Sequence, residues 1–258
     1  NDQDSFLEEA KFGWNQNNYI VEVGKSLGRI YGWKTVGLYQ VDDFNYDPAT
    51  KKYTLKEGIP YNTNNTPQPG YWKFENVDDE GASKGVIDDN DRTVIGDANP
   101  ILYGGMNNTF SYKGFDLSLL FQGSSGANRM MYGEWIEGPS YEAFTGVHFR
   151  DRWTEENQNG NAEMPRLEAA NNRNASTYNS FFLKKTNYLR LKNAQLGYTF
   201  SKGITDKLRI TKLRLYVSGS NLLTFSSLYQ GLDPEGKSDR INDFPPLKIV
   251  NFGVNIIF

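Results

Sequence analysis

The sequence predicts an all-β fold, and within that class a transmembrane antiparallel β-barrel with long extracellular loops. Three observations lead to this prediction. Several segments alternate apolar and polar residues with the period of two that separates the two faces of a β-strand. The connections between these segments are alternately short and long. The chain also combines 25 Gly and 10 Pro residues with 16 Tyr and 16 Phe residues, and this mixture favours strands over helices.

The composition excludes several other classes of protein. The net charge of −3 gives no basic footprint for nucleic acid. Cysteine is absent, so the chain has no disulfide and no thiolate metal site. No apolar run approaches the roughly 20 residues of a membrane helix, but a spanning β-strand needs only about 9–11 residues, so the mean hydropathy of −0.65 is compatible with a barrel. The opening residues lack the basic and apolar regions of a signal peptide, as expected if the signal was removed or the chain is a fragment.

Six segments are predicted to be long strands, at residues 28–40, 101–112, 115–123, 187–200, 211–225 and 250–258. The first is the least periodic, but its aromatic residues Tyr31, Trp33 and Tyr39 share a side, spaced like the girdles at the two ends of a membrane span. The second is rich in Gly. The third has one fully apolar face, made by Phe115, Leu117, Leu119 and Phe121.

The last three predicted strands also have an apolar face. Segment 187–200 changes phase in its middle, and a β-bulge near Lys192–Asn193 would bring its apolar residues to one side. In segment 211–225 the apolar residues lie on one face of the strand, and basic and hydroxyl side chains lie on the other. Segment 250–258 alternates without a break and ends on the aromatic residue Phe258.

The connections between these strands fall into two groups. Lys113–Gly114 and Ser201–Ile210 are short, whereas 41–100, 124–186 and 226–247 are long. Outer-membrane barrels have short turns on the periplasmic side and long loops outside the cell, and a β-sandwich seldom separates its loops in this way. The three long connections are therefore expected to be extracellular loops.

Six strands are too few to close a membrane barrel, which needs about eight or more. The chain is therefore expected to be part of a larger barrel. Residues 1–27 would lead in from a preceding barrel strand or periplasmic turn, and residues 28–258 would form the C-terminal strands. Two alternatives remain at this point: a soluble extracellular carbohydrate-binding β-sandwich, which would bury its apolar faces in a core, and an outer-membrane adhesin without a transport role.

Six motifs in a fixed order resemble one family of outer-membrane proteins. They are VGKSLGRIYGWKTVGLYQ (23–40), PGYWKFENVDDEG with GVIDDNDRTVIGDANP (69–100), YKGFDLSLLFQGSSG (112–126), RWTEENQNGNAEMPR (152–166), YLRLKNAQLGYTF (188–200) and LRLYVSGSNLLTFSSLYQGLDPE (213–235). Together they resemble the C-terminal part of the SusC/RagA-type TonB-dependent transporters of Bacteroidetes, over nearly all of the chain after residue 20.

This resemblance implies a barrel of about 22 strands with a plug that lies outside these residues. It also implies a surface lipoprotein of SusD type as partner, TonB as the source of energy, and oligosaccharides or peptides as substrates. A dimer of such receptor–lipoprotein pairs would fit the same family, and no enzymatic activity is implied. Phe258 resembles the terminal aromatic signal that the barrel-assembly machinery recognises. Its alternative is an ordinary strand end in a soluble sheet.

One acidic loop is a candidate metal site. Residues 75–92 gather several carboxylates, and calcium prefers six to eight oxygen ligands. The candidate ligands of a structural Ca²⁺ are Glu75, Asp78, Asp79, Asp88 and Asp91. The loop resembles a family calcium loop but departs from it by an insertion before Gly85. The alternative is a solvated acidic loop in which Arg92 pairs with a neighbouring carboxylate.

Aromatic side chains crowd the connection 124–186 and are candidates for stacking on substrate. The candidate substrate-binding residues are Tyr132, Trp135, Tyr141 and Trp153. They could instead form a small core of the loop or contact the lipoprotein. Four basic residues are expected on or next to the lumen side of the barrel, where they would guide anions or pair with acidic groups of the plug: Arg190, Lys192, Lys212 and Arg214.

No catalytic residue is predicted. His148 is the one histidine and has no cysteine or triad motif to act with.

Overall fold

The computed structural model describes residues 10–12, 19–63, 66–80, 84–131, 150–158, 164–166, 179–228, 232–236 and 246–258. It divides into two compact units. Unit 1 comprises residues 1–98, 129–184 and 239–241, and unit 2 comprises residues 99–128, 185–238 and 242–258. This division differs from the predicted boundary between residues 27 and 28. Among the described residues, no helix is long and apolar enough to cross a membrane.

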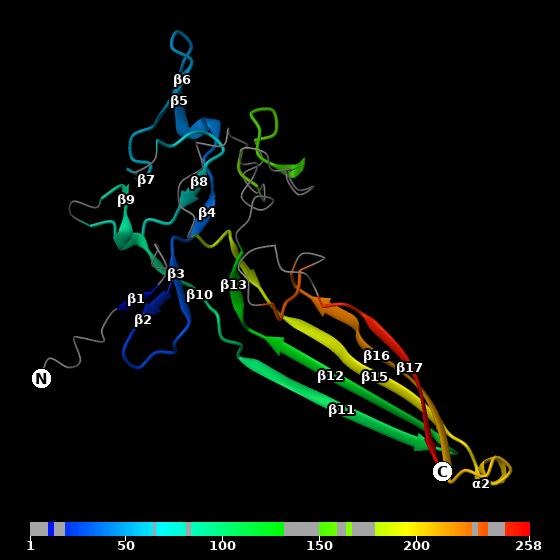
Figure 1. The fold of residues 1–258 in the computed structure, drawn as a ribbon. Coiled ribbons are helices and arrows are strands. Elements are labelled where there is room, and N and C mark those ends of the chain that lie inside the picture. The colour runs from blue at the N-terminus through cyan, green and yellow to red at the C-terminus, as the bar shows by residue number, and fades with distance from the viewer. Residues whose placement is uncertain are drawn as a thin grey trace, which may run out of the picture. The chain divides into compact units, whose positions relative to one another are not determined.

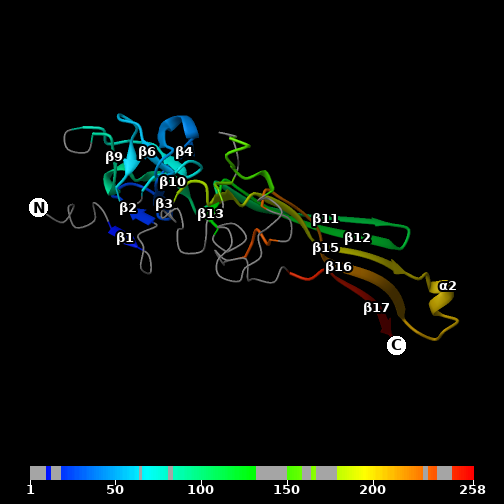
Figure 2. The same cartoon turned by 90° about the horizontal axis from the view of Figure 1, so that it is seen from above.

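Unit 2 is built on one five-stranded antiparallel sheet (Figure 1). Its strands are β11 (Leu102–Tyr112), β12 (Phe115–Ser125), β15 (Tyr188–Thr199), β16 (Lys212–Ser226) and β17 (Ile249–Ile257). They have 11, 11, 12, 15 and 9 residues, so every strand reaches the roughly 9–11 residues that cross a membrane. The strands lie side by side in chain order, as the second view also shows (Figure 2).

The register of the sheet aligns apolar residues with apolar residues across all five strands. One row comprises Phe110, Leu117, Leu196, Val217 and Phe252, each paired with the next. The neighbouring row, on the opposite face, comprises Thr109, Ser118, Gln195, Ser218 and Asn251. The sheet therefore has one apolar face and one polar face, as the alternation in the sequence predicts.

The predicted bulge is confirmed. Leu120 and Phe121 of β12 are adjacent, but their partners on β15 are Asn193 and Leu191, so Lys192 is the extra residue. The bulge keeps the apolar residues on both sides of it on the same face of β15.

The apolar face is exposed in the part of the chain that the structure describes. The side chain of Phe252 is 85% exposed and that of Phe110 is 59% exposed. The described residues place no second layer over these side chains, as a soluble β-sandwich would require. An exposed apolar face on strands of this length is the arrangement expected for one wall of a membrane barrel.

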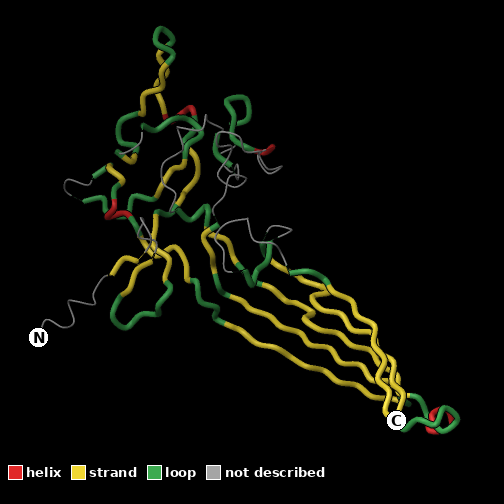
Figure 3. Tube along the Cα trace, viewed as in Figure 1, coloured by secondary structure: helices red, strands yellow, loops and turns green. Residues whose placement is uncertain are grey.

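The connections of the sheet are segregated by length (Figure 3). Lys113 and Gly114 both have positive φ, as in the two-residue turns that join antiparallel strands, and residues 200–211 make the other short connection with the helical turn α2 (Lys202–Thr205). The long connections, 126–187 and 227–248, leave and rejoin the strands at their other ends, and their bounds nearly match the predicted loops 124–186 and 226–247. The chain also enters β11 at that end.

The prediction of a long strand over residues 28–40 is wrong. These residues form two short strands in different sheets, β3 (Arg29–Gly32) and β4 (Thr35–Leu38). Trp33 and Tyr39 pack in unit 1 and do not mark the ends of a span. Three aromatic residues on one side were too weak a signal, because glycine interrupts the segment and the other side has no regular polar pattern. The prediction that residues 1–27 lead in from a preceding barrel strand or periplasmic turn assumed that a spanning strand begins at residue 28.

Unit 1 consists of short strands. A four-stranded sheet has the order β1 (Ala10–Phe12), β2 (Tyr19–Val21), β3, β10 (Thr93–Asp97). The remaining strands form pairs: β4 with β8 (Trp72–Phe74), β5 (Phe44–Asp47) with β6 (Lys52–Leu55), β7 (Tyr61–Asn62) with β9 (Val86–Ile87), and β13 (Asn128–Met130) with β14 (Leu183–Lys185). The predicted loop 41–100 thus contains six short strands among its described residues, β5 to β10.

Candidate functional site

The polar face of the five-stranded sheet carries a buried ionic network centred on Arg190. Only 2% of Arg190 is exposed. Its Nη2 donates to Asp233 Oδ1 at 2.5 Å, its Nη1 donates to Glu235 Oε2, and its Nε donates to Thr224 Oγ1 at 3.0 Å. Arg190 and Thr224 are register partners on β15 and β16, whereas Asp233 and Glu235 belong to the connection between β16 and β17. The two carboxylates thus hold part of a long connection against the sheet.

Glu235 is the most highly connected residue of this network. Its Oε2 accepts from Lys192 Nζ at 2.9 Å, and its Oε1 accepts from the Tyr188 hydroxyl at 3.0 Å and from Gln122 Nε2 at 3.1 Å. A buried cation is tolerated only when it is paired and hydrogen-bonded, and here Arg190 has both kinds of partner.

A second ion pair crosses the sheet nearer to its short connections. Arg214 of β16 donates from Nε to Asp116 Oδ1 at 3.0 Å and from Nη2 to Asp116 Oδ2 at 2.5 Å, the two-bond geometry typical of Arg and carboxylate. Asp116 is on β12, so the guanidinium lies across the intervening strand, β15. It passes over Gly197, where an added Cβ would overlap it, so the absence of a side chain at this position permits the ion pair.

The four basic residues predicted for the lumen side are therefore mostly paired within the chain. Arg190, Lys192 and Arg214 have carboxylate partners from β12 or from the last long connection, and the plug is not needed to neutralise them. Sequence reasoning missed Asp233 and Glu235. The sequence shows only that the two carboxylates lie two residues apart in the predicted loop 226–247. Nothing local shows which strand they face.

In the acidic loop, Asp91 organises the backbone. It is fully buried, and its Oδ1 accepts from the backbone N–H groups of Val77 at 2.7 Å and Asp78 at 3.0 Å, while its Oδ2 accepts from that of Asp88 at 2.8 Å. Asp79 accepts from Asn76 Nδ2 and from the Gly85 N–H.

No group of three or more His, Cys, Asp or Glu side chains converges as metal ligands within the described residues. The calcium site therefore stays a prediction. Arg92 lies over the rings of Tyr31 and Trp33, at 4.8 and 5.1 Å from their centroids, and donates to the Tyr31 carbonyl.

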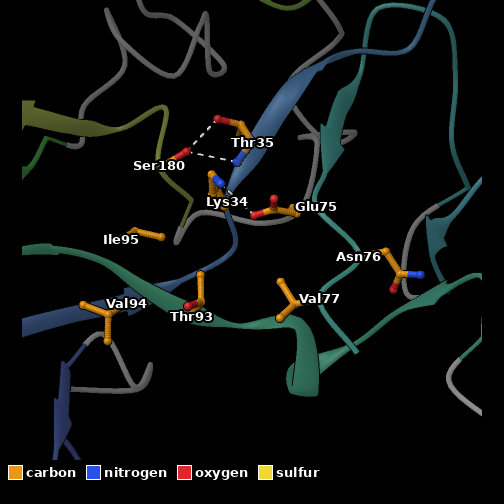
Figure 4. Close-up of a pocket in the computed structure, with 9 residues that line it drawn as sticks. All are labelled: Lys34, Thr35, Glu75, Asn76, Val77, Thr93, Val94, Ile95 and Ser180. Atoms are coloured by element: carbon orange, nitrogen blue, oxygen red, sulfur yellow. Dashed lines mark hydrogen bonds and ion pairs between the residues drawn. The ribbon is translucent and has the colours of Figure 1, made fainter. Parts of the chain in front are cut away.

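Unit 1 also contains an open cavity of about 620 Å³ (Figure 4). An ion pair between Lys34 Nζ and Glu75 Oε2, 2.9 Å apart, lies on one side of it. On another side Ser180 Oγ accepts from the Thr35 N–H at 2.9 Å and lies 2.7 Å from Thr35 Oγ1. The lining mixes hydroxyl, charged and aliphatic side chains, with no arrangement typical of a catalytic site. Glu75, a predicted calcium ligand, is thus engaged with Lys34.

The predicted substrate-stacking residues have different outcomes. Tyr132, Trp135 and Tyr141 lie outside the described residues, as does His148. Trp153 is 2% exposed and packs in a core with Leu38, Trp72, Phe74 and Ile87. Its Nε1 donates to Gln40 Oε1 at 2.9 Å. Trp153 is therefore a packing residue in this structure and offers no free ring face to a substrate. Phe258 is exposed at the end of β17.

Comparison with curated proteins identifies the family. TonB-dependent receptor P3 of Formosa agariphila is 30% identical to this chain, over 99% of the chain and 24% of the relative. TonB-dependent receptor P39 of the same bacterium is 29% identical, over 86% of the chain and 23% of the relative. The chain belongs to the TonB-dependent receptors. It spans about a quarter of the length of these relatives, which are receptors and not enzymes. No family model matches the chain.

Solved structures agree with the receptor fold. The RagAB peptide transporter superposes on this receptor chain with a TM-score of 0.71 and 20% identity, over 98% of the chain and 25% of the solved one. The closed-closed state of the RagAB peptide importer gives a TM-score of 0.65, again at 20% identity and over 96% of the chain and 25% of the solved one. The chain thus has the fold of part of the β-barrel in these solved structures.

Proposed function

We propose that this chain forms part of the wall of an outer-membrane importer, which takes up oligosaccharides or peptides with energy supplied through TonB. The exposed apolar face of the five-stranded sheet carries the proposal. Burying it in a bilayer removes large side chains such as Phe252 from water, while the polar face lines the passage. The barrel-assembly machinery would insert the receptor, with Phe258 as part of its recognition signal.

The remaining parts of the importer are inferred from the family resemblance. A surface lipoprotein of SusD type would cover the end of the barrel that carries the long connections, and two such pairs could associate. Likeness to a peptide transporter favours peptides, whereas the family resemblance includes oligosaccharides. The polar face suits either class, because its Ser, Thr, Asn and Gln side chains offer hydrogen bonds without selecting a charge.

The proposal is tested in the bacterium that encodes the receptor. Deleting the full-length gene should abolish uptake of one class among fluorescently labelled oligopeptides and oligosaccharides, and complementation should restore it. A protonophore should abolish the same uptake in the parent strain, because TonB uses the proton gradient. Unchanged uptake of both classes in the deletion strain would contradict the importer. Loss of surface attachment with unchanged uptake would support an adhesin instead.

A further inference from the structure

The short connections of the five-stranded sheet carry a concentration of positive charge. The basic turn cluster comprises Lys113, Lys202, Lys207 and Arg209. These residues lie in the turn between β11 and β12 and in the connection between β15 and β16. The one acidic residue in these connections is Asp206, although the chain as a whole has a net charge of −3. The local charge is thus opposite in sign to that of the chain.

The charges of the basic turn cluster are available to a partner. All four side chains are exposed. None of them makes an ion pair with another described residue, in contrast to Arg190, Lys192 and Arg214 higher on the same sheet. Lys113 lies with its Nζ 5.2 Å from the centroid of the Tyr112 ring, which leaves the ammonium group open to solvent on its other sides.

Apolar side chains are exposed next to these cations. Ile204 is 43% exposed and Leu208 is 56% exposed, although both lie in a polar connection. The Leu208 N–H donates to the Ile204 carbonyl, so the two side chains are one helical turn apart and share a side. At the adjoining strand ends, Tyr112 and Phe115 are also exposed on the apolar face of the sheet. Aromatic residues at this level are typical of the boundary between hydrocarbon and headgroups.

We propose that the basic turn cluster binds the anionic headgroups of phospholipids in the leaflet at the short-connection end of the barrel. This inference rests on the membrane placement in the proposed function. Cations at the strand ends would lie at headgroup depth, and Ile204 and Leu208 would enter the region between headgroups and acyl chains. A free phosphate ion would use the cations but not these apolar side chains, so a lipid fits the surface better.

Each exposed cation near an anionic membrane surface strengthens binding about five-fold, which corresponds to about 1 kcal/mol. The basic turn cluster should therefore favour phosphatidylglycerol over zwitterionic phosphatidylcholine. Full-length receptor purified in a maltoside detergent is titrated with each lipid, and native mass spectrometry counts the lipids bound. The test variant is Lys202→Gln/Lys207→Gln/Arg209→Gln. A matched control removes three exposed cations of unit 1, with Lys51→Gln/Lys52→Gln/Lys84→Gln.

The preference for phosphatidylglycerol should fall at least about tenfold in the test variant and stay unchanged in the control. Ile204→Ser/Leu208→Ser should weaken binding of both lipids but leave the charge preference intact. Equal binding of the two lipids by the unaltered receptor would overturn the inference, as would a preference that survives in the test variant. Complete competition by inorganic phosphate would assign the cluster to free anions instead. Heat-modifiable receptor in the outer-membrane fraction separates these failures from a failure of the membrane placement itself.

Discussion

A charge placed on the apolar face of β16 should cost far more than the same charge placed on its polar face. Val217 and Ser218 are neighbours near the middle of β16, so they lie at nearly the same depth. Val217 pairs with Leu196 and Phe252, whereas Ser218 pairs with Gln195 and Asn251. The two positions therefore differ in the face that they occupy and hardly in anything else.

Val217→Arg would bring a guanidinium into hydrocarbon. For a lipid-facing position near the midplane of a barrel this costs about 2–4 kcal/mol. Ser218→Arg would place the same group beside amide and hydroxyl side chains on the polar face, where water and hydrogen-bond partners remain available. Its cost should stay within about 0.5 kcal/mol, the range typical of a surface substitution.

The assay compares heat-modifiable, folded receptor in outer membranes of cells that express each variant at equal levels. Val217→Arg should lower the folded yield severalfold, and Ser218→Arg should leave it close to that of the unaltered receptor. Equal yields for the two variants, or a lower yield for Ser218→Arg, would refute the assignment of the apolar face to lipid.

Three further perturbations follow from contacts described above. Glu235→Gln should lower the free energy of unfolding by about 1–3 kcal/mol, because Arg190 loses one of its two carboxylate partners and keeps Asp233. Thermal unfolding of the purified receptor measures this, and Glu235→Gln/Arg190→Met should cost less than the sum of the single changes. Asp91→Ala should speed amide hydrogen exchange across residues 75–92, because each backbone N–H left without an acceptor costs about 1–3 kcal/mol. If the carboxylate acts without metal, the increase in exchange rate should be the same in calcium and in a chelator. Burial raises the pKa of the Tyr39 hydroxyl above its usual 10.0, and the negative charge of Asp43 adds to the effect, so folding favours the neutral phenol. Its contribution to the free energy of unfolding is therefore present below pH 10 and lost as the pH rises above it. Tyr39→Phe should remove this loss in unfolding curves measured at alkaline pH.

Much of the wall could be predicted because its signal is local. In each long strand of unit 2, the alternation of apolar and polar residues indicates which side of the strand is apolar. Lys113–Gly114 has the residue types of a tight hairpin turn. The bulge at Lys192 was predictable because the apolar residues before and after it have opposite phase. Where alternation was weak, in residues 28–40, the prediction failed, since three aromatics can lie on one side of a strand or pack into the cores of a folded loop.

The candidate sites depended on contacts that local patterns do not encode. The acidic loop was found from composition, but the role of Asp91 as an acceptor for three backbone N–H groups depends on how residues 77, 78 and 88 surround it. Trp153 was found as an aromatic residue in a long connection, and its burial depends on Leu38 and Trp72 from distant parts of the chain.

By itself the sequence determined that five segments form an amphipathic antiparallel sheet with short turns at one end, because a period of two and the chemistry of a turn are properties of neighbouring residues. Only the tertiary structure decided that Asp233 and Glu235 neutralise Arg190 and that Arg214 reaches Asp116 over Gly197. Those pairs join residues more than 40 positions apart, and a long-range ion pair is selected by the register and curvature of the folded chain, which no local pattern specifies.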